Sequence, residues 1–299
     1  MKTLAAILVA LVAVASARHL NIDLEDVMEL ENTYEYDYLN RVAVPLAEEI
    51  RKAEEEGGDL TRIVGGSLAR LGQFPYQVGF VLTLPSGSTA FSGGALVSRN
   101  RVLSAAHNFH NQVSSVSALT VVLGSITIFT GGTRLTPSRL VLHENYIPNP
   151  VRNDLAMVYL ASNVNTNNNI APIALPSGAQ LNENFVNSIA TASGFGKTAD
   201  IGGVVANQPL SFVNLRVITN QECINTFGSN NVQATNICTS GEGGKNICTG
   251  DSGGPLAVNR NNRPILIGIT SFGAVQCQSG RPSAYARVTS YISWINRNL

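Results

Sequence analysis

The sequence predicts an all-β protein with a helix at its C-terminus. Its apolar segments are short, rich in β-branched residues and separated by Gly, Pro and Asn, which is typical of antiparallel sandwiches or barrels. A hydrophobic content of 44% supplies enough apolar side chains for a core in a chain of 299 residues. The pattern alone does not choose between a sandwich and a barrel. Strands are expected at 77–82, 91–97, 102–105, 118–123, 126–129, 139–142 and 155–160, and again at 188–194, 210–218, 236–238, 255–258, 265–272 and 283–288.

Residues 1–17 have the composition of a signal peptide. Lys2 supplies the charged start, residues 4–14 are apolar, and Ala15-Ser16-Ala17 fits the small-residue cleavage pattern. The apolar run is too short to span a membrane. We therefore expect a secreted, extracellular protein with no membrane association.

Residues 18–62 have the character of an acidic propeptide. They hold 13 acidic and 5 basic residues, whereas the chain from Ile63 onward holds 7 acidic and 14 basic residues. Residues 45–56 are expected to form a helix that starts at a proline and places Leu46 and Ile50 on one face. Without a cysteine the segment cannot stay disulfide-linked after cleavage, so we expect its release. Two roles are open for this segment: it assists folding or masks the enzyme, or it contributes only to solubility.

The C-terminal helix is expected to begin at a cap formed by Thr289 or Ser290. Tyr291, Trp294 and Ile295 then follow at i, i+3 and i+4 and form one apolar stripe. Such a stripe favours packing against the core over a binding role.

Three segments carry residue types suited to nucleophilic catalysis. Residues 250–255 read Gly-Asp-Ser-Gly-Gly-Pro, and their glycines favour a tight loop with several N–H groups on one side. Such a loop can present Ser252 as a nucleophile and stabilise an oxyanion, although an isolated Gly-x-Ser-x-Gly is more often a turn. Upstream, His107 ends the run Ser-Ala-Ala-His and Asp154 lies in Asn-Asp-Leu-Ala, each beside an apolar segment.

With these motifs in the order His, Asp, Ser, the chain resembles a chymotrypsin-family serine protease made as a zymogen, and in particular the insect digestive chymotrypsin-like and collagenase-like enzymes. The resemblance covers residues 63–299 and includes Ile-Val-Gly-Gly after Arg62, Pro-Tyr-Gln-Val at 75–78 and Ser-Phe-Gly at 271–273. It implies two six-stranded antiparallel β-barrels with a C-terminal helix, with the site in the cleft between them. The boundary between the two halves is expected near 163–180.

The resemblance also implies roles for the motif residues. Ser252 is expected to attack a peptide carbonyl, His107 to act as general base and acid, and Asp154 to orient the histidine. The N–H groups of Gly250 and Ser252 are expected to form the oxyanion hole. The reaction needs no metal or organic cofactor.

Activation is expected to follow cleavage after Arg62 by a trypsin-like protease. The resemblance implies that the new amine of Ile63 turns inward and pairs with Asp251, the acid before the nucleophile. A buried carboxylate needs such a partner, and the pairing remodels the adjacent loop.

The expected primary specificity pocket has Asn246 at its base, where trypsin-like enzymes carry Asp. Ser271, Gly273 and Ser283 match other substrate-binding positions, with Gly273 and Ser283 as the walls. Without a carboxylate at the base, Lys or Arg would be left unpaired, so we expect a chymotrypsin-like preference for large apolar side chains. Ser283 stands where many relatives have Gly and could narrow the pocket, which leaves an elastase- or collagenase-like specificity as the alternative.

The four cysteines predict two disulfides in a secreted chain, and by count alone they allow three pairings. The family pattern implies Cys223 with Cys238 and Cys248 with Cys277. No C-x-x-C pair is present, which argues against zinc, and the absence of acids at 124–136 argues against a calcium site.

One feature of the family is missing. The disulfide that most relatives have beside the catalytic histidine has Ser92 and Asn108 at its two positions, so another interaction must hold this loop.

The expected partners are protein or peptide substrates, the activating protease and protein inhibitors of proteases. Scattered arginines without interleaved aromatic residues argue against nucleic-acid binding. We expect a monomer with a digestive role, for which the gut lumen is one setting. A non-catalytic homologue that binds other proteins and a regulatory cascade protease are the alternatives.

Overall fold

The computed structural model describes residues 39–56, 65–110, 115–197, 200 and 209–299. By their contacts all described residues belong to one compact unit. The predicted signal peptide and the predicted cleavage site at Arg62 and Ile63 lie outside the described residues.

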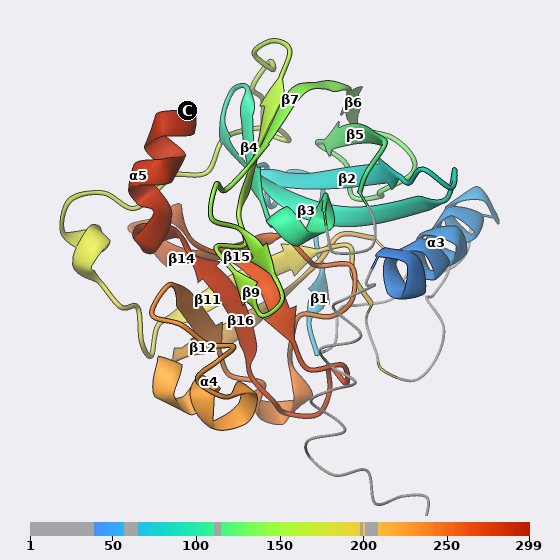
Figure 1. Cartoon of the computed structure of the whole chain (residues 1–299). Coiled ribbons are helices and arrows are strands. Elements are labelled where there is room, and N and C mark those ends of the chain that lie inside the picture. The colour runs from blue at the N-terminus through green and yellow to red at the C-terminus, as the bar shows by residue number, and fades with distance from the viewer. Residues whose placement is uncertain (1–38, 57–64, 111–114, 198–199, 201–208) are drawn as a thin grey trace, which may run out of the picture. The chain divides into compact units, whose positions relative to one another are not determined.

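The first half of the region from Gly65 onward forms one antiparallel sheet in the order β6-β5-β2-β3-β4-β10-β7 (Figure 1). Only Thr136 separates β6 from β7, and these two strands pair with β5 and β10 at opposite ends of the sheet. The sheet therefore curls into a half-barrel. Its strands are β2 (Gln77–Thr83), β3 (Thr89–Ser98), β4 (Arg101–Ser104), β5 (Ala118–Leu123), β6 (Thr133–Leu135), β7 (Pro137–Leu142) and β10 (Ala156–Leu160). A small ribbon of β8 (Ile147–Pro148) and β9 (Val151–Arg152) precedes β10.

The second half is a closed barrel. Its sheet runs β1-β12-β11-β14-β15-β16-β13, and a further pairing of β12 with β13 closes six of these strands into a ring. The short strand β1 adds to the outside of β12. The strands are β1 (Ser67–Leu68), β11 (Ile189–Gly194), β12 (Ser211–Ile218), β13 (Asn236–Thr239), β14 (Pro255–Arg260), β15 (Arg263–Gly273) and β16 (Ser283–Arg287).

The prediction of an antiparallel all-β fold with a C-terminal helix is confirmed, with one closed six-stranded barrel and one half-barrel. The strand expected at 126–129 is wrong, because these residues form a loop. The hydroxyls of Ser125 and Thr127 both donate to the carbonyl of Thr130, and Gly131 and Gly132 have φ of 65°. Those contacts and left-handed glycines fold the chain back before β6 begins.

Short helices complete the fold. They are η1 (Leu39–Ala43), α3 (Val44–Glu56), η2 (Ala106–Asn108), η3 (Gly178–Asn182), α4 (Asn220–Phe227), η4 (Glu242–Gly244) and α5 (Val288–Asn298). The helix predicted at 45–56 is α3. The cap predicted for α5 is wrong, because the helix begins at Val288 and its N-cap is Arg287, which makes no side-chain cap hydrogen bond. None of the helices in the described ranges is long and apolar enough to cross a membrane.

Helix α5 packs where the two halves meet. Its predicted stripe of Tyr291, Trp294 and Ile295 is buried in a cluster with side chains of β4 and β10 from the first half and of β14 and β15 from the second. Such shared burial stabilises the two halves against each other. The residues with catalytic potential lie in η2 and in the loops that precede β10 and β14.

Candidate active site

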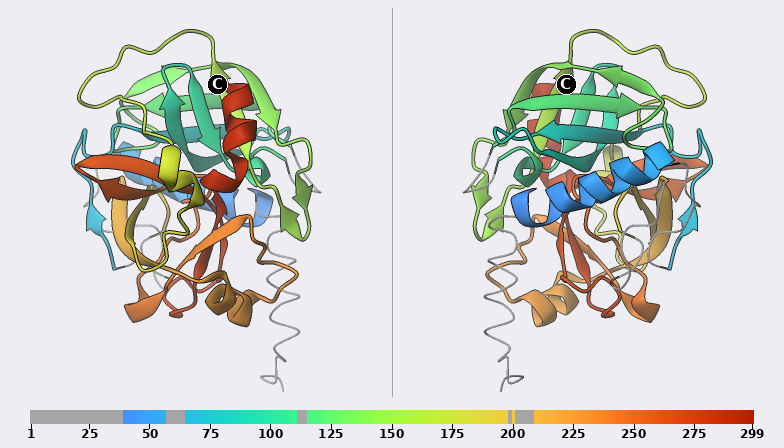
Figure 2. Two further views of the ribbon diagram at one scale, coloured as in Figure 1. Left: turned by 90° about the vertical axis from the view of Figure 1, so that its left-hand side faces the viewer. Right: turned by 90° about the vertical axis from the view of Figure 1, so that its right-hand side faces the viewer.

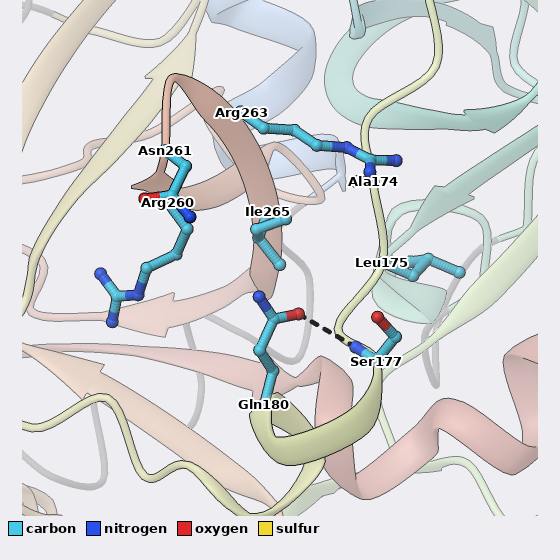
Figure 3. Close-up of a pocket in the computed structure, with 8 residues that line it drawn as sticks. All are labelled: Ala174, Leu175, Ser177, Gln180, Arg260, Asn261, Arg263 and Ile265. Carbon is cyan, nitrogen blue, oxygen red and sulfur yellow. Dashed lines mark hydrogen bonds between the residues drawn. The ribbon is translucent and has the colours of Figure 1, made fainter.

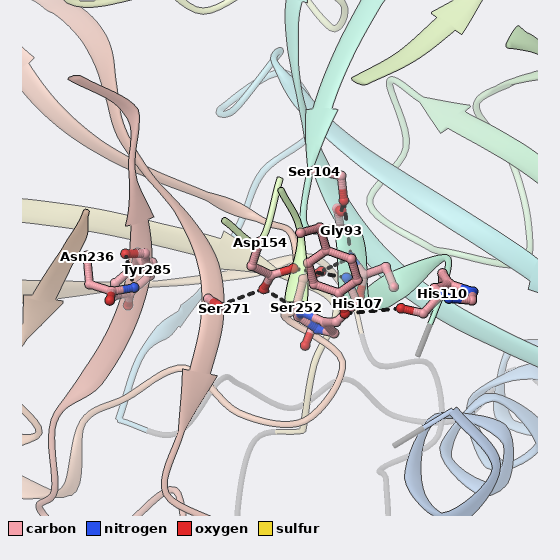
Figure 4. Close-up of polar contacts among 11 residues, drawn as sticks. Gly93, Ser104, His107, His110, Asp154, Asn236, Ser252, Ser271 and Tyr285 are labelled. Atoms are coloured by element: carbon pink, nitrogen blue, oxygen red, sulfur yellow. Dashed lines mark hydrogen bonds and ion pairs between the residues drawn. The ribbon is translucent and has the colours of Figure 1, made fainter. Parts of the chain in front are cut away.

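The site begins at the end of β4, where η2 carries His107. The backbone N–H of His107 donates to Asp154 Oδ1 at 2.9 Å, and His107 Nδ1 lies 2.7 Å from Asp154 Oδ2 (Figure 4). Because an ionised carboxylate only accepts, the hydrogen of this contact resides on Nδ1. The Nε2 atom is then the nitrogen that can take a proton.

Asp154 is buried, and the residue before it has an unusual backbone conformation. Asn153 has φ of 50°, a conformation that Asn tolerates better than most residues, and the turn precedes β10. A third group, Ser271, donates its hydroxyl to Asp154 Oδ2 at 2.6 Å. Ser271 stands at an irregularity in the pairing of β15 with β16, between Thr270 and Phe272, where a side chain can be redirected.

The charge of Asp154 is stabilised in place. Burial by itself would raise the pKa of this carboxyl, but the attraction of His107 and the hydrogen bonds from His107 and Ser271 outweigh burial and lower the pKa below its usual value. The residue therefore stays ionised near neutral pH and favours a positive charge on the imidazole.

Ser252 lies in the loop before β14, beside His107 (Figure 4). Gly250 and Gly253 on either side have φ of 97° and 77°, which only glycine adopts without strain. A Cβ at Gly253 would also collide with Ser104 and Asn108, so this position admits no side chain. The glycines of the hexapeptide thus bring the serine loop directly against the histidine loop.

Asn108 joins these two loops, and the sequence did not reveal its role. Its Nδ2 donates to the backbone carbonyl of Ser252 at 3.2 Å and to Ser104 Oγ at 3.1 Å. Ser104 Oγ donates in turn to the carbonyl of Gly93 at 2.7 Å, and the N–H of Gly93 donates to the same Ser252 carbonyl at 2.8 Å. This network holds the loop that lacks the family's disulfide. The one sequence feature that pointed to this network was the Asn at position 108, where most relatives have a disulfide-bonded cysteine.

The replacement leaves two polar atoms without hydrogen bonds. Within the described part of the chain, Ser92 Oγ and Asn108 Oδ1 are buried and have no hydrogen-bond partner. An unpaired buried oxygen of this kind destabilises the fold.

Asp251 is buried beside Ser252 in the sequence. Its Oδ1 accepts the N–H of Gly196 and its Oδ2 accepts the N–H of Cys248, each at 2.8 Å. Burial raises the pKa of this carboxyl to about 6, and the two backbone hydrogen bonds only partly offset the effect. Its predicted partner, the amine of Ile63, lies outside the described residues.

Three of the four predicted substrate-binding residues, Asn246, Gly273 and Ser283, lie together, whereas the hydroxyl of Ser271 is bonded to Asp154. Gly273 and Ser283 are paired across β15 and β16, and Ser283 Oγ donates to Asn246 Oδ1. Asn246 Nδ2 donates to the carbonyl of Arg281 at 2.9 Å. The buried polar atoms at this point therefore satisfy one another.

Comparison with known proteins gives the family. The sequence profile of the family described as Trypsin matches residues 63–295. The chain belongs to the trypsin family. Its protease region is 37% identical over 238 residues to the collagenase of Hypoderma lineatum, covering 79% of this chain and 87% of that protein. It is 35% identical over 243 residues to trypsin-1 of Astacus astacus, covering 79% of this chain and 99% of that protein.

A solved structure of HL collagenase supports the same assignment. It matches with a TM-score of 0.71 and 35% identity, covering 79% of this chain and 98% of that chain. The protein is thus a serine endopeptidase of the trypsin family with a trypsin-like fold.

The protease has the two disulfides that the family pattern implied. Cys223 is bonded to Cys238 and Cys248 to Cys277, with Cα atoms 6.3 and 5.4 Å apart. Asp200 lies close to the second bridge, but its carboxylate accepts the N–H groups of Cys277 and Gln278. Oxidised cysteines are poor metal ligands, so this cluster does not make a metal site.

A separate hollow of about 270 Å³ lies between the start of β15 and η3 (Figure 3). None of the catalytic candidates lines it. Its Arg260 is paired with Glu183, and Gln180 accepts the N–H of Ser177 at its edge. Because these side chains bind one another, they do not indicate which kind of ligand the hollow would take.

Proposed function

We propose that the protease is secreted as an inactive precursor and, once cleaved, hydrolyses peptide bonds with His107, Asp154 and Ser252 as its catalytic triad. The observation that carries this proposal is the placement of Ser252 against the His107–Asp154 pair by short glycine-rich and hydrogen-bonded loops. Membership of the trypsin family supports the same chemistry.

In this mechanism Ser252 Oγ attacks the substrate carbonyl while His107 Nε2 takes the hydroxyl proton. Asp154 keeps the proton of Nδ1 in place and stabilises the imidazolium. The N–H groups of Gly250 and Ser252 stabilise the oxyanion. His107 then gives the proton to the leaving amine, and water hydrolyses the acyl-enzyme by the same steps.

Activation is proposed to follow cleavage between Arg62 and Ile63. The buried Asp251 supports this step, because its raised pKa marks a carboxylate whose charge is poorly compensated by two backbone N–H groups. An inserted amine would supply the missing charge. The match to the family profile also begins at Ile63.

The proposed specificity is for apolar side chains. The amide of Asn246 is already engaged by Ser283 and by the carbonyl of Arg281, and it offers no negative charge to a substrate cation. A Cβ at Gly273 would lie 3.0 Å from Ser283 Oγ, so the Ser283 hydroxyl faces this wall closely. That contact supports the elastase- or collagenase-like alternative, in which Leu or smaller residues fit better than Phe.

The test starts from the secreted precursor. It is cut by catalytic trypsin, its new N-terminus is sequenced, the trypsin is inhibited selectively, and peptides ending in Phe, Leu, Ala and Arg are assayed. We expect an Ile63 N-terminus and cleavage after Phe or Leu that is lost in a Ser252→Ala control. Fastest cleavage after Arg would overturn the specificity, and correct processing with no activity would overturn the triad. Digestion of casein or collagen tests the proposed digestive role.

A further inference from the structure

Residues 39–56 precede the proposed cleavage site, yet they belong to the same compact unit as the protease. By its contacts this unit is not divided at the cleavage site. Helix α3 (blue) lies along the protease region with β3 as its main neighbour, and the right-hand view of Figure 2 shows its course. The described part of the acidic segment therefore behaves as part of the enzyme's core.

Most of the described apolar side chains of this segment are buried, and Val44 is half-buried. Leu39 and Ile50 are 0% exposed and Leu46 is 2% exposed. Leu46, Ala47 and Ile50 pack in one cluster with side chains of both halves, including those of Val122 and Ile128 from the first and Phe195 and Leu210 from the second. Burial of this kind, and not the short helix itself, is what stabilises such an element.

Glu54 adds a polar contact at the end of α3. Its Oε1 accepts the N–H of Ile128 at 2.9 Å, both carboxylate oxygens accept the N–H of Phe129 at 3.1 Å, and Oε2 accepts the hydroxyl of Thr130 at 2.8 Å. Hydrogen bonds from backbone N–H groups to a carboxylate are stronger than neutral ones. Departure of the helix would remove the partner of these loop N–H groups.

The surface under the segment is the back of the active site. Leu46 and Ile50 share their cluster with Phe91, and a Cβ at Gly250 would lie 2.6 Å from Cζ of that ring, so the ring touches the proposed oxyanion loop. At the other end, Leu39 and Ala43 share a cluster with residues that flank His107, namely Ala106 and Phe109.

We propose that residues 39–56 stay bound after activation as a non-covalent light chain, and that they support the histidine loop and the Gly250 loop from behind. The proposal rests on the activation cleavage proposed above. The absence of cysteine from the segment predicted its release, whereas its burial and the Glu54 contacts favour retention. The same packing supports the loop that has lost the family's disulfide.

Retention is tested directly on the cleaved chain. Residues 58–62 are replaced by Asp-Asp-Asp-Asp-Lys, so that enteropeptidase cuts before Ile63 and spares the exposed Arg51 and Lys52 of α3. The cut protein, with Ser252→Ala to prevent self-digestion, is passed over a size-exclusion column at micromolar concentration. We expect equimolar leader peptide in the protease peak by mass spectrometry. Elution of the peptide by itself would overturn the proposal.

Support of the active site is tested with the active form. Serial dilution should release the peptide, and activity per enzyme should fall at the concentration where native mass spectrometry shows the loss. A synthetic peptide of residues 36–57 should restore activity. For the Glu54→Gln peptide, the concentration that restores half of the activity should be at least about tenfold higher, which corresponds to the loss of about one charge-assisted hydrogen bond. The Glu55→Gln peptide, which is changed at an exposed neighbour, should restore activity at the same concentration as the unaltered peptide.

Constant or rising activity after the peptide is lost would overturn the supporting role, as would equal rescue by both variant peptides. Because only the peptide changes in the rescue experiment, folding of the protease is not at risk. A cut chain that keeps its peptide but shows no Ser252-dependent cleavage would instead refute the proposed function, since co-elution does not depend on activity.

Discussion

Replacing Asp251 with Asn should remove a large part of the pH dependence of stability in the uncut protein. The folded-state pKa of Asp251 is about 6, against a usual value of 3.8. Between these values the folded protein binds the proton more tightly than the unfolded chain does. Stability therefore falls as the pH rises through this window, and a difference of about 2 pKa units corresponds to about 3 kcal/mol.

The assay is urea unfolding of wild type and Asp251→Asn between about pH 4 and pH 8, both with Ser252→Ala and uncut. The Asn amide cannot accept from both Gly196 and Cys248, so the variant carries a destabilisation that is independent of pH. The informative quantity is the difference between the two unfolding free energies. The wild type should lose about 2–3 kcal/mol relative to the variant as the pH rises across this range.

Carboxyls with a lowered pKa contribute with the opposite sign, but they are shared by both proteins and cancel. Asp154 has a lowered pKa, so its contribution is present at neutral pH and is lost as the pH falls. A wild-type-minus-variant difference that stays flat within about 1 kcal/mol would refute the argument that Asp251 carries an uncompensated charge. After cleavage, pairing with the new amine should abolish or reverse the trend.

Three further predictions concern other parts of the site. Asn108→Ala should lower kcat with little change in KM and cost about 1–3 kcal/mol of stability, because the carbonyl of Ser252 loses a donor; unchanged kinetics would show that the network does not position the loops. Asn246→Asp should raise cleavage after Arg and Lys relative to Leu in a peptide panel, at a cost in stability by urea unfolding, because the new carboxylate would face the Arg281 carbonyl. Unaltered selectivity would place Asn246 outside the pocket. Replacing both Cys248 and Cys277 with Ser, which opens a link across 29 residues, should lower the unfolding free energy by about 3–4 kcal/mol. A loss below about 1 kcal/mol in urea would show that this link does not constrain the unfolded chain as the entropy model requires.

The sequence was informative wherever local chemistry determines the structure. The glycines around Ser252 could be anticipated because positive φ and close backbone contact leave few other residues possible. The buried stripe of α5 followed from its spacing. The disulfide pairing came from family resemblance, since the count of cysteines leaves three choices.

What the sequence could not give were contacts between distant segments. The hydrogen bond from Asn108 to Ser252 joins residues 144 positions apart, and no local pattern marks it. The contact of Glu54 with Phe129 is of the same kind, and it coincides with the strand wrongly expected at 126–129. β-Branched residues there resembled a strand, but hydroxyl contacts and two left-handed glycines decided the conformation.

The distribution of the disulfides has a consequence for biosynthesis. Both bridges lie within residues 223–277, and they span 15 and 29 positions. The half that carries His107 and Asp154 contains no cysteine, and its histidine loop is fastened by Asn108 and Ser104. This half can therefore reach its final packing without oxidation, and it emerges first from the ribosome. Oxidative folding is left to the half made last, where each cysteine has its partner close by along the chain.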